Sequence, residues 1–112
     1  MTYRVEKVNE LIKREISEII AREIELPLDS LVTVVQVKTA SDLTQTKIYL
    51  SIFPITKAAE ILKILRQRIG YLQGLLNRRL VMRPLPRINF LIDTTEEEAN
   101  QVEDIIKKVY PS

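Results

Sequence analysis

The sequence predicts an α+β fold in which helices cover a three-stranded sheet. Three observations support this prediction. In four segments apolar residues recur every three or four positions, which is the spacing of a helix that buries one face. Three other segments are rich in β-branched residues or alternate between apolar and polar side chains, as strands do. The segments follow the order helix, two strands, two helices, strand and a final helix.

The composition is that of a soluble globular protein. The chain has 112 residues, of which 46% are hydrophobic and 29% charged, so we expect residues 1–112 to form a single domain with one core. Neither Cys nor His occurs, which excludes disulfides, thiolate metal sites and histidine-based catalysis. The apolar runs are short, so we expect no membrane span, and the first ten residues do not resemble a secretory signal.

The first element is expected to be a long helix over residues 3–24. Thr2 is expected to cap its start. Pro27 is expected to close it, because proline lacks an amide hydrogen and disfavours helix immediately before it. The buried stripe of this helix is expected to contain Val5, Val8, Leu11, Ile12, Ile16, Ile19 and Ile20.

Two strands are expected to follow. Residues 31–38 are β-branched and nearly continuous in apolar character, which predicts a strand largely buried on both faces. Residues 46–53 alternate, so one face of the second strand is expected to carry Ile48, Leu50 and Ile52. The polar residues 39–45 between them, in which Ser41 and Asp42 offer local hydrogen bonds, predict an antiparallel hairpin with a longish loop.

Two helical stripes come next, with Gly70 between them. The first helix is expected to run from Lys57 to about Arg68, with Thr56 as its cap. Glycine inside a helix costs about 1 kcal/mol relative to alanine, which predicts a break or kink at or beside Gly70. One straight helix through an incidental glycine remains the alternative. The two stripes consist of Ala58, Ile61, Leu62, Leu65 and Ile69, and of Leu72, Leu75, Leu76 and Leu80.

The last two elements are a strand and a helix. Pro84 and Pro86 are expected to end the helical region, and the alternation over residues 88–92 predicts the third strand. Thr94 and Glu97 fit a capping box at the start of a C-terminal helix. The apolar stripe of that helix is expected to contain Ala99, Val102, Ile105, Ile106 and Val109.

Charge is distributed unevenly along the chain. Residues 1–37 carry five Lys/Arg and seven Asp/Glu, residues 38–92 carry ten and two, and residues 93–112 carry two and six. The net charges are therefore −2, +8 and −4, which sum to the +2 of the whole chain. A basic middle segment suggests a face that attracts a polyanion. A merely solvated surface is the other interpretation, although such a surface normally intersperses acids.

The basic residues of the middle segment are the candidate RNA contacts. Arginine binds two phosphate oxygens at once and lysine supplies a mobile point charge. If the two central helices meet at a kink, charges on both are expected to flank one groove. Reversal of Arg66 and Arg78 to Glu is then expected to weaken binding with stability intact, and reversal of Lys107 and Lys108 to matter less. The candidates are Lys38, Lys47, Lys57, Lys63, Arg66, Arg68, Gly70, Arg78, Arg79, Arg83 and Arg87.

Aromatic residues give a second, weaker indication. Tyr49 and Phe53 share one face of the second strand, which makes a base-stacking platform conceivable. Packing under a helix is the interpretation we favour, because stacking platforms usually carry more exposed aromatic residues.

Enzyme chemistry finds no support in the motifs. Gly70 and Gly74 are the only glycines, so a glycine-rich phosphate loop is absent from the sequence. Asp42 and Glu60 are the only acids of the middle segment and their spacing does not pair them. The run of Glu96, Glu97 and Glu98 is explained by the electrostatics of a helix start. We therefore expect no catalysis, no cofactor, no metal and no small-molecule substrate.

Several short motifs, in order along the chain, resemble the ribosome-binding factor A family. Arg4-Val5, Glu15-Ile16-Ser17 and Ile19-Ile20 resemble its opening helix, and Val35-Gln36-Val37, Ser41-Asp42-Leu43 and Thr46 to Ser51 resemble its strand–loop–strand signature. The second half of the resemblance rests on Gly70-Tyr71-Leu72, Leu75-Leu76, Leu80, Arg83, Pro86, Phe90 and Asp93. The match covers roughly residues 3–108.

The resemblance implies a type II KH-like domain with an α-β-β-α-α-β core and an added C-terminal helix. KH domains clamp RNA with a Gly-x-x-Gly loop between paired helices, whereas this family has an Ala-x-Gly kink. Arg68-Ile69-Gly70 occupies that position here, so the alanine is replaced. Gln73 stands where an arginine is usual and Arg87 where a glutamate is usual. The geometry of the kink and the individual contacts therefore do not carry over from the family.

The function that the resemblance implies is small-subunit assembly. The family binds the free small ribosomal subunit (30S) and its 16S rRNA, aids late processing of the 16S precursor, especially in the cold, and is not enzymatic. A cytoplasmic monomer with no membrane contact is expected. The alternatives are a KH-like module for other RNA and a protein–protein adaptor. Steep loss of binding as salt rises would favour either RNA reading over an adaptor.

Overall fold

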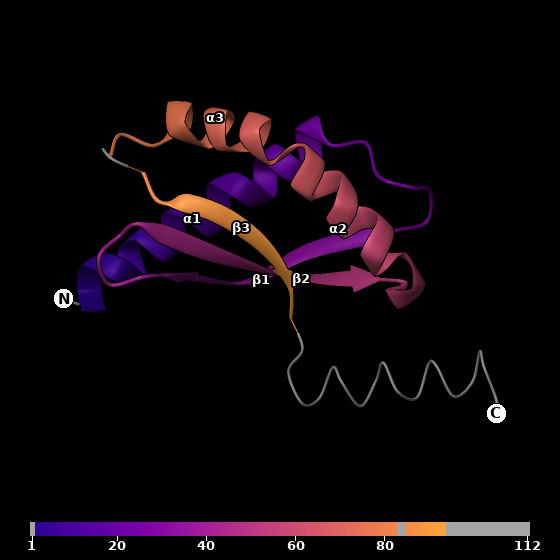
Figure 1. The fold of residues 1–112 in the computed structure, drawn as a ribbon, viewed down its shortest axis with the longest axis horizontal. Coiled ribbons are helices and arrows are strands. Elements are labelled where there is room, and N and C mark those ends of the chain that lie inside the picture. Colours follow the sequence, from indigo (N-terminus) through magenta and orange to yellow (C-terminus); the bar gives the residue numbers. More distant parts are fainter. Residues whose placement is uncertain (1, 83–84, 94–112) are drawn as a thin grey trace.

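The computed structural model describes residues 2–82 and 85–93. Its elements are α1 (Thr2–Glu23), β1 (Leu31–Thr39), β2 (Gln45–Phe53), the short 3₁₀ turn η1 (Ile55–Lys57), α2 (Ala58–Gln67), α3 (Ile69–Arg79) and β3 (Arg87–Ile92). Figure 1 shows helices and sheet in this arrangement. The predicted α+β class and the α-β-β-α-α-β order are therefore confirmed. The predicted capping box at Thr94 and the C-terminal helix lie outside the described residues.

The sheet is mixed, with the order β1-β2-β3. β1 and β2 form the predicted antiparallel hairpin, in which Leu31 lies opposite Phe53 and Thr39 opposite Thr46. β3 runs parallel to β2, with Gln45 opposite Arg87 at one end of the ladder. A parallel pair needs a crossover connection, and α2 and α3 provide it. Among the strands that the structure describes, β1 and β3 are thus the two edges of the sheet.

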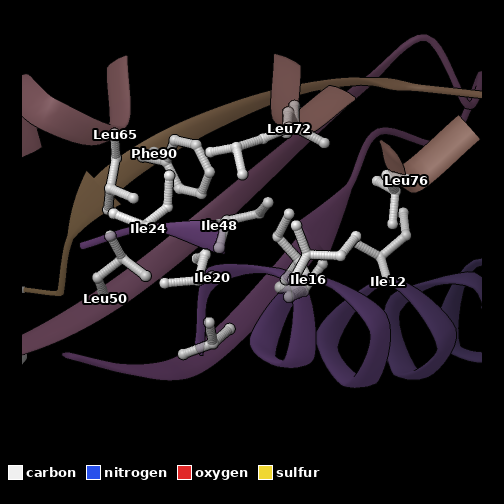
Figure 2. Close-up of a cluster of buried hydrophobic side chains, with 14 of the residues drawn as sticks. Ile12, Ile16, Ile20, Ile24, Ile48, Leu50, Leu65, Leu72, Leu76 and Phe90 are labelled. Carbon is white, nitrogen blue, oxygen red and sulfur yellow. The ribbon is translucent and has the colours of Figure 1, made fainter. Parts of the chain in front are cut away.

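The three helices of the described residues pack on one face of the sheet, where their apolar stripes meet. Ile12 and Ile16 of α1, Leu72 of α3 and Phe90 of β3 are fully buried in one cluster (Figure 2). The predicted stripes supply most of this cluster, because each helix places its periodic apolar residues toward the sheet. Along β2 and β3, side chains that face the helices are buried and alternate with side chains that point to the opposite face. None of these helices covers that opposite face, which we call the free face of the sheet.

β1 differs from its prediction. It is not buried on both faces: Val34 and Val37 are buried, whereas Leu31 is 64% exposed. β1 is an edge strand, and α1 covers only one of its faces. The register shifts between Val34 and Gln36. This bulge places an extra residue in the strand, which lets two positions three apart face the same core.

The roles predicted for Pro27 and Thr56 at helix termini are corrected, whereas the predicted end of the first helix at residue 24 lies within one residue of the observed end. α1 ends at Glu23, four residues before Pro27. Thr56 lies inside η1, and the N-cap position of α2 is Lys57, which makes no side-chain cap hydrogen bond. The chain enters α2 from a 3₁₀ turn, so the first turn needs no threonine cap.

The predicted break between the central helices is confirmed, but its cause is not glycine. The helices separate at Arg68, whose φ of −100° and ψ of 9° end α2 and begin α3. Gly70 lies inside α3, has no positive φ, and has open space where a Cβ would stand. The break has a tertiary cause, because α2 packs on β3 while α3 also packs on α1 (Figure 1). One straight helix cannot present its apolar stripe to both.

Candidate nucleic-acid interface

The candidate basic residues fall into three groups, so they do not flank one groove as predicted. The first group is exposed on the outer side of α2 and α3, the second lies on the free face of the sheet, and the third is engaged within the protein. Arg83 lies outside the described residues. The groups are Lys63, Arg68 and Arg78; Lys38, Lys47 and Arg87; and Lys57, Arg66 and Arg79.

The first group lies along α2 and α3: Arg68 is at the junction, Lys63 is on α2 and Arg78 is near the C-terminal end of α3. The guanidinium carbon of Arg68 lies 4.7 Å from the centroid of the Tyr71 ring, within the range of a cation–π contact. Arg78 stands two turns further along α3, on the side of Tyr71, and is exposed. Gly70 is exposed between them and leaves space beside the backbone. The junction therefore offers Arg68, an aromatic ring and an accessible stretch of backbone, and Arg78 adds a charge further along α3.

Tyr71 connects this junction to α1. Its hydroxyl donates a hydrogen bond to Oε2 of Glu23 at 3.0 Å. This bond to the Glu23 carboxylate is the main cause that raises the pKa of Tyr71, and the neighbouring charges of Arg68 and Arg78 oppose it. Sequence reasoning did not single out Tyr71 as a contact residue, although its place beside Gly70 was a usable signal.

Lys63 extends the first group onto α2. It is exposed and lines a shallow depression of the helix surface together with Ala59, Leu62, Arg66 and Gln67. Within the described residues Lys63 makes no ion pair. Its charge is therefore available to a ligand on the outer side of the helices.

The third group is used to hold the fold together. Arg66 donates from Nη2 to the carbonyl oxygen of Phe90 at 2.9 Å. Arg79 donates from Nη1 to Oε2 of Glu15 at 3.2 Å and of Glu18 at 3.0 Å, which ties α3 to α1. Lys57 Nζ donates to the carbonyl oxygen of Leu28 at 3.4 Å. These residues are less suited to contact RNA than the sequence suggested, and reversal of Arg66 would disturb stability.

Gln73 has a structural role that sequence reasoning missed. Its Nε2 donates to the carbonyl oxygen of Pro86 at 3.1 Å, and its Oε1 accepts from the backbone N–H of Ile88 at 2.9 Å. The side-chain amide thus bonds to the outer edge of β3 as a neighbouring strand would. Nε2 also donates to Oδ1 of Asn77 at 3.0 Å. The only signal in the sequence was the unusual glutamine at this position.

The second group lies on the face of the sheet away from the helices. Lys38 and Lys47 are directly opposite each other on β1 and β2. Arg87 begins β3 opposite Gln45, one row further. Tyr49 is half-buried and Phe53 is 64% exposed on this face. The favoured prediction that both aromatics pack under a helix is thus not met by α1, α2 or α3.

Other kinds of site are not indicated by the part of the chain that the structure describes. In residues 2–82 and 85–93, no cluster of three or more acids is placed to hold a metal ion. No described helix has the length and apolar character needed to cross a membrane. The described surfaces can bind a ligand through positive charges, hydrogen bonds and aromatic stacking.

Comparison with known proteins agrees with this picture. A family model described as ribosome-binding factor A matches residues 4–106. Ribosome-binding factor A of Akkermansia muciniphila is 34% identical over 97% of this chain and 90% of its own length. The crystal structure of ribosome-binding factor A from Thermus thermophilus has a TM-score of 0.68 and 30% identity, and covers 79% of this chain and 94% of its own.

A further similar structure concerns a ribosomal complex. It is a homology model of Thermus thermophilus ribosome-binding factor A, fitted into a cryo-EM map of its complex with the 30S subunit. Its TM-score is 0.63 at 31% identity, and it covers 74% of this chain and 88% of its own.

Proposed function

Because the chain belongs to the ribosome-binding factor A family, we propose that it binds the free small ribosomal subunit and its 16S rRNA during late assembly. It acts there as a non-enzymatic factor that aids processing of the 16S precursor. We propose further that it does so as a cytoplasmic monomer whose chain forms one KH-like RNA-binding domain.

One observation carries the proposal: the exposed cations along α2 and α3, on either side of the junction between them. Lys63, Arg68 and Arg78 make no ion pair with a described residue. Gly70 leaves room beside them for an RNA backbone. Phosphate contacts fix the position of a protein on RNA, and each contact releases bound counterions. The junction therefore supplies affinity for a folded rRNA region without reading a base sequence.

The mechanism needs no bond chemistry. A protein that binds an immature rRNA arrangement more tightly than the mature one shifts the population toward the immature arrangement while it is bound. Maturation of that region lowers the affinity, and the factor leaves. The discrimination comes from the shape of the RNA that can reach Lys63, Arg68 and Arg78 together.

The test is co-sedimentation with purified small subunits, compared with large subunits and free 16S rRNA over a range of salt concentrations. We expect selective binding to small subunits that weakens steeply as salt rises. Equal binding to every RNA would favour the generic KH-like module instead, and binding insensitive to salt would favour a protein–protein adaptor.

The matched variants are Lys63→Glu/Arg78→Glu and Arg4→Glu/Lys7→Glu. Both pairs reverse two exposed cations, and Arg4 and Lys7 lie on α1 away from the junction. The first variant changes Lys63 and leaves Arg66 unchanged, because Arg66 is bonded to the carbonyl oxygen of Phe90 and its reversal would disturb stability. We expect the junction variant to lose at least about one unit of the slope of log affinity against log salt, with unchanged thermal stability. Equal losses in both variants would indicate diffuse attraction and contradict the assignment of the junction.

A further inference from the structure

We propose that the free face of the sheet is a second RNA-contact surface, which takes a single-stranded segment over Lys38, Lys47, Tyr49 and Arg87. This inference rests on the proposed function and adds a surface to it. The free face is separated from the α2–α3 junction by the sheet and the core beneath it (Figure 1).

The register of the sheet brings the three cations together. Lys38 and Lys47 are direct partners on neighbouring strands. Lys47 lies opposite Asn89, and Arg87 lies opposite Gln45, so Arg87 is the diagonal neighbour of Lys47. Direct partners have Cβ atoms about 5 Å apart and diagonal neighbours lie about 7–8 Å apart. All three cations are exposed.

This arrangement is unfavourable without a ligand. Like charges directly opposite each other in a sheet destabilise it, and none of the three cations makes an ion pair with a described residue. The hairpin loop beside them holds one acid, Asp42. Its Oδ1 accepts from the Thr44 hydroxyl at 2.7 Å and from the Thr44 N–H at 3.1 Å, and these bonds lower its pKa. Asp42 is held in the loop by Thr44 and forms no ion pair with the three cations, so a phosphate backbone would relieve their repulsion.

Neighbouring groups on the same face suit unpaired bases. Lys38 Nζ lies 5.7 Å from the centroid of the Tyr49 ring. Gln36 lies opposite Tyr49, and Gln45 and Asn89 flank Lys47, so three amides surround the ring and the cations. An aromatic ring stacks on a base only where the base is unstacked from its neighbours, and amides bond to the base edges that pairing would hide. The occupant is therefore a single strand rather than a duplex.

Two RNA surfaces on opposite sides give the protein a bridging geometry. Once one RNA segment is bound at the junction, a second segment of the same subunit reaches the sheet at a high effective concentration. Either surface alone then has modest affinity, and the pair together selects an rRNA arrangement in which both segments are present. The proposed function then requires that the immature subunit presents two RNA segments, one on each side of the protein.

The experiment uses the full chain with Lys38→Ala/Lys47→Ala, and Arg4→Ala/Lys7→Ala as the control with the same change in net charge. The probes are a single-stranded oligouridine RNA and purified small subunits. We expect the sheet variant to lower the slope of log affinity against log salt by about 1.4 for both probes, at about 0.7 per single-strand phosphate contact. Its stability should equal or exceed that of the unsubstituted protein, because a like-charge pair is removed.

A second measurement identifies what covers the face. Acylation of lysines in the full chain, read by mass spectrometry, should modify Lys38 and Lys47 readily in the free protein and slowly in the subunit complex. Protection already present in the free protein would mean that another part of the chain, such as acidic residues 93–112, occupies the face, and would overturn the proposal. Equal reactivity in both states would overturn it as well.

The two proposals fail in different ways. If the junction variant loses subunit binding and the salt slope of the sheet variant is unchanged, the second surface is refuted. The proposed function is then still supported. Failure of the unsubstituted chain to select small subunits would remove the proposed function, whatever the oligouridine result.

Discussion

At the scale of single residues, two polar side chains complete the outer edge of β3. Among the described strands β3 pairs with β2 alone, so its other edge has no described strand beside it. Gln73 bonds to Pro86 and Ile88, and Arg66 bonds to Phe90, from the helices that pack over this edge. An exposed edge strand is a template for unwanted pairing, and these side chains block it. Arg66, which was expected to contact RNA, thus has a structural role. Gln73, which departs from the family pattern, has one too.

Replacement of Gln73 tests this role. Gln73→Ala leaves the carbonyl of Pro86 and the N–H of Ile88 without their partner, and an unsatisfied, partly buried backbone group costs about 1–3 kcal/mol. We expect the free energy of unfolding, measured with urea, to fall by about that amount. Gln67→Ala is the control, because Gln67 is exposed at the end of α2. Equal stability of both variants would show that the edge bonds contribute nothing.

At the scale of elements, the separation of α2 and α3 determines which side chains face outward. The break at Arg68 lets Leu65 face the sheet and Leu72 reach the core near α1, and both are fully buried. It also presents Arg68 at the corner between the helices, stacked on Tyr71. The local backbone shows no need for the glycine that follows.

Gly70→Ala should change stability and RNA affinity in opposite directions at the α2–α3 junction. Gly70 lies in α3 without a positive φ, and no atom lies within 4 Å of the position that a Cβ would take. We expect the free energy of unfolding to rise by up to about 1 kcal/mol, because alanine favours helix. Subunit affinity should fall if an RNA backbone approaches the glycine closely. A fall in stability would contradict the geometry of α3, and unchanged affinity would place the RNA away from Gly70.

At the scale of the whole molecule, stability should be constant over a wide pH range, because no titratable side chain has an ordinary pKa near neutrality. The chain contains no histidine, the only side chain whose ordinary pKa lies near neutrality. Hydrogen bonds from Thr44 lower the pKa of Asp42, and the bond to Glu23 raises the pKa of Tyr71. Stability from Asp42 is present above the ordinary Asp pKa of about 3.9 and is lost as pH falls through the lowered value. Stability from Tyr71 is present below about pH 10 and is lost as pH rises through the raised value.

Urea unfolding across pH checks this expectation. The midpoint should stay constant between about pH 6 and 8, fall as pH drops below about 4 and fall as pH rises above about 10. Asp42→Asn should flatten part of the acid limb and Tyr71→Phe part of the alkaline limb. A steep slope between pH 6 and 8 would mean that another group titrates on unfolding.

The existence and order of the described elements could be predicted from the sequence, because they depend on local periodicity. The spacing of Ile12 and Ile16 indicates a helix, and the alternation around Ile48 a strand, whatever they pack against. The hairpin followed from the same patterns. The cationic character of residues 38–92 and the family resemblance also needed only the sequence.

What the tertiary structure decided was where each of these residues faces and what it contacts. The exposure of β1 follows from its place at the edge of the sheet, and the position of the helix break follows from packing on two different partners. Arg66 and Arg78 are both exposed, yet Arg66 bonds to the carbonyl oxygen of Phe90 while Arg78 makes no ion pair with a described residue. Local patterns carry no information about residues distant in the chain. Only the fold brings Lys38 opposite Lys47 and places them across the sheet from the helix junction, because register and layer order are set by contacts between distant segments.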